Sequence, residues 1–174
     1  MASRPVRTHQ RLGLDSTLDF MRVLWALEHA LRTTSKRMKT RLGVTGQQRL
    51  VLRIVERFPL ISAGDLARVT WLHPSSLTGL LRRLERRGLL ERVTDTRDRR
   101  RVQLRIRPSA RRLTASDVRT VEAAVAKMLT SLPRAHVIRV RHALTTLAQM
   151  LDERVVDHDN LPGVLLRDRS ASGR

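Results

Sequence analysis

The sequence contains no cysteine and no tyrosine, and aromatic residues make up only 2% of its 174 positions. Without cysteine, disulfides, thiolate metal ligands and thiol redox sensors are excluded. With so few aromatic side chains, Leu, Val, Ile and Ala must form the core, which favours helices over a β-sandwich. No apolar run approaches the roughly 20 residues that span a bilayer, and the basic first residues lack the hydrophobic segment of a secretory signal. We therefore expect a cytoplasmic protein without a membrane partner.

Positive charge is abundant, because 35 Lys and Arg stand against 16 Asp and Glu, a formal net charge of +19. A charge of this size indicates a polyanionic partner rather than a particular fold. Arg far outnumbers Lys, and the planar guanidinium matches phosphate oxygens and the guanine edge. A GC-rich genome would explain the preference for Arg over Lys but not the excess of positive charge. Nucleic acid is therefore the first candidate partner.

Apolar residues at helical spacing predict a long first helix and a shorter second one. The first starts near Leu14, is capped by Asp15 or Ser16, and ends at Gly43. Such a long helix generally needs a partner along much of its face. Thr45 caps the second helix, residues 46–57, which Phe58 before a proline ends. Its residues expected to face the core are Leu50, Val51, Ile54 and Val55.

A pair of helices joined by a short turn follows. Ser62 caps the first, and Pro74 is suited to the first position of the second, where its missing N–H is not needed. This second helix, residues 74–87, ends at Gly88. The pattern then changes to two alternating strands, residues 89–93 and 102–106, around a charged tip, which predicts a β-hairpin. The order of elements predicts a winged helix-turn-helix between Ser62 and Ile106.

Two further helices are expected after Pro108. The first is capped by Thr114 or Ser116, and Pro133 opens the second. The fold class is therefore mainly α with a small β-hairpin wing, in about six helices. The expected division is a flexible basic arm (1–13), an N-terminal dimerisation helix (14–44), a DNA-binding lobe (45–107), C-terminal dimerisation helices (108–156) and a tail (157–174).

The second helix of the pair is expected to enter the major groove of DNA, and the hairpin tip, residues 95–101, the minor groove. Small hydroxyl residues at the helix start approach phosphates and base edges closely, and arginines lie one turn later. From Ser62 to Arg107, twelve Arg stand against five acids. The candidate DNA-binding residues are Ser75, Ser76, Thr78, Gly79, Arg82, Arg83, Arg97, Arg99 and Arg100. Asp95 and Asp98 are expected to hold the wing arginines in place.

Residues 66–106 resemble the MarR family of bacterial regulators. The resemblance rests on Ser75 to Thr78, on the Leu84-Glu85 and Gly88-Leu89-Leu90 pieces, and on the wing residues Asp98-Arg99-Arg100. It implies a homodimer whose N-terminal and last two helices interlock, two winged lobes that bind a palindromic operator, and a small-ligand pocket beside each lobe. We expect a repressor that a small ligand releases.

Three residues depart from the family pattern. Gly79 stands where many relatives carry an arginine that contacts bases, so base recognition is expected to shift to its neighbours. Trp71 replaces a small residue, and His73 replaces the usual Asp or Ser cap, which leaves the helix start less well capped. The only unusual side chains near an expected ligand pocket are Trp25, His29 and Trp71, although a core role is the simpler interpretation of Trp25.

Two other functions are weighed against a regulator. An architectural DNA-binding protein would explain the charge, and it would show similar affinity for operator and random DNA at matched salt. An enzyme is the weakest alternative, because the sequence shows no phosphate loop, no nucleophile setting and no paired carboxylates on one face. The six histidines lack metal-ligand spacing, so no metal and no other cofactor is expected.

Overall fold

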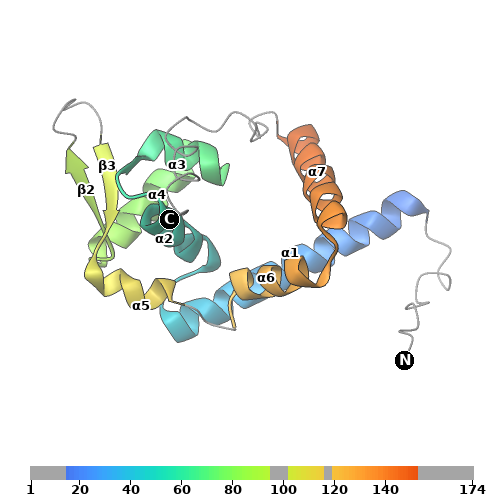
Figure 1. The fold of residues 1–174 in the computed structure, drawn as a ribbon, viewed down its shortest axis with the longest axis horizontal. Coiled ribbons are helices and arrows are strands. Elements are labelled where there is room, and N and C mark those ends of the chain that lie inside the picture. Colours follow the sequence, from blue (N-terminus) through green and yellow to red (C-terminus); the bar gives the residue numbers. More distant parts are fainter. Residues whose placement is uncertain (1–14, 95–101, 116–118, 153–174) are drawn as a thin grey trace, which may run out of the picture.

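The computed structural model describes residues 15–94, 102–115 and 119–152, arranged as a compact lobe and a long helical arm (Figure 1). The lobe contains α2 (Gly46–Arg57), β1 (Ile61–Ser62), α3 (Ala63–Thr70), α4 (Pro74–Arg86), β2 (Leu90–Thr94) and β3 (Val102–Ile106). A 3-10 turn, η2 (Pro108–Ala110), and α5 (Arg111–Thr114) follow. The arm consists of α1 (Ser16–Leu42), α6 (Val121–Ser131) and α7 (Arg134–Leu151). This order confirms the mainly α fold with a hairpin wing.

The helix ends follow local capping chemistry. Asp15 caps α1 by accepting a hydrogen bond from Leu18 N at 2.8 Å, and Gly43 ends it in a left-handed conformation at φ 76°. Thr45 and Gln48 form a reciprocal capping box at the start of α2. Ser62 caps α3 by accepting from Asp65 N at 3.0 Å. The capping residues predicted for these three helices are confirmed.

A three-stranded antiparallel sheet in the order β1-β3-β2 forms the wing base. The hairpin register runs from Leu90 opposite Ile106 to Thr94 opposite Val102, and Ile61 of the short β1 lies opposite Leu104. The predicted hairpin is confirmed, with its first strand one residue later than expected.

The core of the lobe lies between α2, α3, α4 and the sheet. Its buried side chains include Val51, Leu52, Val55, Leu66, Leu77, Leu80, Leu81, Leu84 and Leu104. The prediction that Leu50 faces the core is wrong, since its side chain is 43% exposed. The buried face of α2 instead includes Gln48 and Arg49, because Arg49 finds hydrogen-bond partners that the apolar pattern of the helix does not reveal.

The segment between the hairpin and the arm differs from the prediction. It contains η2 and the short α5, so the described residues hold seven α-helices rather than about six. Thr114 lies at the end of α5 instead of capping the next helix. Thr120 caps α6 by accepting from Ala123 N at 3.2 Å. Several Ser and Thr residues lie in this stretch, and local chemistry alone does not choose among them.

In Figure 1, α1 extends away from the lobe, with α6 alongside it and α7 rising at the far side. Only Met38 of α1 is buried, and α6 and α7 contain no buried residue. The arm therefore presents much of its apolar surface to solvent in a single copy of the chain. No helix among the described residues is long and apolar enough to cross a membrane.

Candidate nucleic-acid interface

Helix α4 is fixed on the lobe by one apolar face. Leu77, Leu80, Leu81 and Leu84 are buried, the last of them completely. These leucines follow one another at intervals of three, one and three positions, so they form one stripe along the helix that packs against the core. The opposite face is consequently held in a defined orientation, and it exposes Ser75, Ser76, Thr78, Arg82, Arg83 and Arg86.

The start of α4 is built around an imidazole cap. His73 Nδ1 accepts from Ser75 N at 3.3 Å and lies 2.6 Å from Ser75 Oγ. Pro74 occupies the first helical position, as predicted. The helix N-terminus therefore carries backbone N–H groups, which favour an anion.

The three hydroxyls of this first turn differ in hydrogen bonding. Thr78 Oγ1 donates to Pro74 O at 2.8 Å, so its oxygen is left only to accept. Ser75 Oγ is engaged with His73. Ser76 is exposed and makes no side-chain hydrogen bond within residues 15–94, 102–115 and 119–152. Phosphate oxygens only accept hydrogen bonds, so Ser76 is the hydroxyl best placed to donate to one.

The arginines of α4 remain without an acidic partner in the described part of the chain. The lobe acids pair elsewhere: Asp65 with Arg68, Glu85 with Arg92, and Glu91 with both Arg105 and Arg107. Positive charge is therefore compensated on α3 and the sheet but stays uncompensated at Arg82, Arg83 and Arg86. This distribution concentrates positive charge beside the exposed hydroxyls of α4.

Gly79 lies within this face and is partly covered. A Cβ placed on it would lie 3.6 Å from Arg83 Nη1, an ordinary contact distance. The space above Gly79 is thus bounded by an arginine side chain that belongs to the next turn of the same helix. A larger side chain at this position would have to share that space.

The predicted wing tip lies outside the described residues. This holds for Arg97, Arg99 and Arg100, for Asp95 and Asp98, and for the rest of 95–101. The described strands end at the pair Thr94 and Val102. The minor-groove contact stays a prediction.

The three residues of the predicted ligand pocket lie on two separate elements. Trp25, 66% exposed, and the exposed His29 lie one turn apart on α1. Trp71 is half-buried at the end of α3, in a left-handed conformation at φ 54°. Figure 1 shows the first half of α1 well away from α3. The structure therefore does not bring this trio together within one copy of the chain.

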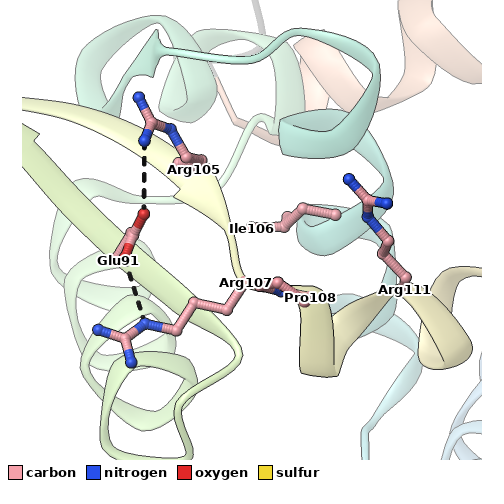
Figure 2. Close-up of a pocket in the computed structure, with 6 residues that line it drawn as sticks. All are labelled: Glu91, Arg105, Ile106, Arg107, Pro108 and Arg111. Atoms are coloured by element: carbon pink, nitrogen blue, oxygen red, sulfur yellow. Dashed lines mark ion pairs between the residues drawn. The ribbon is translucent and has the colours of Figure 1, made fainter.

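A pocket is present instead at the base of the wing (Figure 2). Glu91 lies between two arginines, 3.7 Å from Arg105 Nη1 and 3.3 Å from Arg107 Nε. Arg111 lines the opposite side, with Ile106 and Pro108 between them. The site is open and strongly basic, and sequence reasoning did not single it out.

Comparisons with known proteins relate part of the chain to a known family. Residues 42–101 match the model of the MarR family. The HTH-type transcriptional regulator FarR of Neisseria gonorrhoeae is 32% identical over 84 residues, which are 48% of this chain and 58% of FarR. The match thus spans less than two thirds of that relative's length.

Solved structures share the fold at lower identity. The S. aureus MepR–DNA complex is 18% identical, with a TM-score of 0.62, and the match covers 76% of this chain and 98% of MepR. Streptococcus pneumoniae FabT in complex with DNA is 19% identical, with a TM-score of 0.59 over 80% of this chain and 99% of FabT. Residues 42–101 are thus similar to the MarR family, and the chain shares the winged-helix fold of these solved structures.

Proposed function

We propose that this chain is a transcriptional regulator that binds double-stranded DNA, with α4 in the major groove and the wing, residues 95–101, in the minor groove. The observation that carries the proposal is the exposed face of α4, a helix fixed by four buried leucines. There the hydroxyl of Ser76 accompanies Arg82 and Arg83, which have no acidic partner among the described residues. Helices held in this way suit base recognition, because the edges they contact require a defined position. MepR and FabT, which share the fold, were solved in complex with DNA.

A homodimer is the second part of the proposal. Helix α1 has 27 residues but buries only Met38, and a helix of this kind needs an apolar partner for stability. Exposed apolar side chains continue over α6 and α7. The set comprises Leu18, Phe20, Met21, Val23, Trp25, Leu27, Leu31, Val125, Met128, Leu129, Ile138, Val140, Leu144, Met150 and Leu151. A second copy that covers these helices would bring two lobes onto one operator and assign residues 14–44 and 108–156 to dimerisation.

Selection of bound sequences from a random DNA pool tests both parts. A palindromic motif with half-sites about one helical turn apart is expected from two symmetric lobes. Sedimentation of the free protein should give twice the chain mass. A monomer in solution, or a motif without symmetry, would contradict the dimer.

A matched pair of arginines tests the interface. Arg82→Ala should weaken binding to the selected operator by roughly 1–3 kcal/mol. Arg68→Ala removes an arginine that Asp65 already neutralises on α3, so it should leave the affinity nearly unchanged. Equal losses from the two variants would show that α4 is not the contact surface.

The architectural alternative is favoured by one observation, since Gly79 leaves the middle of α4 without a side chain to contact bases. It predicts equal affinity for the selected operator and for random DNA at matched salt.

Repression and release by a small ligand are proposed from the family resemblance. A reporter gene placed behind the operator, with and without the chain, tests repression directly.

A further inference from the structure

A buried guanidinium on α2 joins the lobe to the arm. Arg49 is 1% exposed, although it carries a full charge. Its Nε–H donates to Glu122 Oε1 at 2.8 Å, and its Nη2 donates to Ala115 O at 2.7 Å. Its Nη1 donates to Leu113 O. One side chain of the lobe thus holds the end of α5 and the first turn of α6.

A second arginine extends the contact. Arg53, one turn further along α2, donates from Nη1 to Thr114 O at 3.3 Å. Thr114 Oγ1 in turn lies 2.9 Å from Glu56 Oε1. Three consecutive carbonyls, those of residues 113, 114 and 115, therefore accept hydrogen bonds from α2. They lie at the C-terminal end of α5, where carbonyls lack helical partners and cations are favoured.

The ion pair between the buried Arg49 and the partly buried Glu122 favours one arrangement of the lobe and the arm. A buried charge is tolerated only when it is paired and hydrogen-bonded. The planar guanidinium donates in fixed directions, so its acceptors must keep fixed positions relative to α2. Glu122 depends on the same partner, because its Oε2 is buried without a hydrogen bond among the described residues. Rotation of α6 against the lobe would leave both charges without their partners.

We propose that Arg49 is a positioning residue, which fixes the orientation of the DNA-binding lobe on the dimerisation helices and thereby sets the separation of the two α4 helices in the dimer. The orientation itself concerns one chain, and only the consequence for α4 separation rests on the proposed function. The residues that would contact DNA lie on another helix, so Arg49 acts through the placement of α4.

Spin-label distance measurements test this proposal, because a chain without cysteine can be labelled only at introduced positions. Arg86→Cys on α4 and Lys127→Cys on α6 are both exposed sites. Labelled protein is diluted with unlabelled protein, so that each distance lies within one chain. For the parent protein we expect a single narrow distribution of the distance between the label on α4 and the label on α6. Arg49→Met should broaden this distribution, so that the narrow peak is lost. Glu122→Ala should broaden it less, because the carbonyl contacts remain.

The matched control is Glu91→Ala, which removes an acid whose ion pairs, with Arg105 and Arg107, lie at the base of the wing. It should keep the narrow peak. If Arg49→Met fails to fold, as judged by circular dichroism, Glu122→Ala decides the question. A folded Arg49→Met or Glu122→Ala protein with the parent's narrow distribution would overturn the positioning role.

A second sample separates this proposal from the proposed dimer. Arg86→Cys alone, fully labelled, reports the distance between the two α4 helices of a dimer. Absence of dipolar coupling in this sample would refute the dimer, while the diluted double-label sample still decides whether Arg49 fixes the lobe on the arm. A narrow distribution of the distance between the two α4 helices, broadened by Arg49→Met, would support both the dimer and the positioning role of Arg49.

Discussion

Replacement of Gly79 by alanine should stabilise the protein. Gly79 lies in the interior of α4 and is not among the glycines with positive φ. A Cβ there would meet Arg83 Nη1 at 3.6 Å, which is an ordinary contact. Glycine inside a helix costs about 0.5–1 kcal/mol relative to alanine, because it loses more backbone entropy on folding. We therefore expect Gly79→Ala to raise the free energy of unfolding by about that amount.

Thermal unfolding followed by circular dichroism measures the effect. For a chain of this length, 1 kcal/mol shifts Tm by about 2–4 °C, so Gly79→Ala should raise Tm by about 1–4 °C. Protein concentration must be equal in all samples, since dimerisation makes Tm depend on it. An unchanged or lower Tm would refute the conclusion that a Cβ at position 79 fits beside Arg83 without strain.

Gly43→Ala is the matched control with the opposite sign. Gly43 ends α1 at φ 76°, in the left-handed region that a Cβ disfavours. The same chemical change should therefore lower stability there, by roughly 1–2 kcal/mol. Stabilisation at both positions would show that the backbone conformation is not the deciding factor.

The same position also tests base recognition. Gly79→Arg introduces the side chain that the family resemblance places here, beside Arg83 on the exposed face of α4. If this face lies in the major groove, selection from random DNA should enrich an additional guanine in each half-site, since arginine pairs bidentately with guanine. An unchanged motif would place residue 79 away from the bases.

Three further predictions test the lobe. Leu84→Ala should lower the free energy of unfolding, measured with denaturant, by about 2–5 kcal/mol, because this side chain is fully buried. Leu50→Ala, at a 43% exposed position, should lower it far less. Similar losses from the two variants would contradict the observed orientation of α2. Leu60→Gly should raise Tm, because it relieves a left-handed residue at φ 67° whose side chain is 40% exposed; a lower Tm would mean that the leucine contributes more by packing than it costs in backbone strain. Ser76→Ala should weaken operator binding, measured by fluorescence anisotropy, more than Thr78→Val does. Of these two hydroxyls only that of Ser76 is free to donate a hydrogen bond. A larger loss from Thr78→Val would argue against a phosphate contact by Ser76.

Most of the lobe could be predicted from sequence because its signals are local. The change from helical to alternating spacing after Gly88 predicted the hairpin, and its strands are found at Leu90–Thr94 and Val102–Ile106. Capping residues predicted where α1, α2 and α3 begin. The exposed face of α4 followed from the positions of its leucines. In each case the residues that decide the outcome lie within a few positions of one another.

Long-range partners explain what the sequence did not reveal. An arginine between a glutamine and a leucine on α2 indicates a solvated position, yet Arg49 is buried by partners 64 to 73 residues away. The start of α6 was placed too early for a related reason. Thr114 is a good capping residue, but its hydroxyl is engaged with Glu56 on α2, and Thr120 takes the cap. The predicted grouping of Trp25 and His29 with Trp71 presupposed a closeness that one chain does not show.

The two tryptophans give the molecule a pair of optical reporters at different places. Trp25 is 66% exposed on α1, where the second copy is proposed to pack, and Trp71 is half-buried at the end of α3, in the short turn before α4. The chain has no tyrosine whose emission would overlap with theirs. Indole emission moves to shorter wavelength when water is excluded from the ring, so a Trp71→Phe protein would report association of the arms. A Trp25→Phe protein would report events at the start of α4. Assembly and DNA binding could thus be followed separately, in two single-tryptophan variants that need no added label.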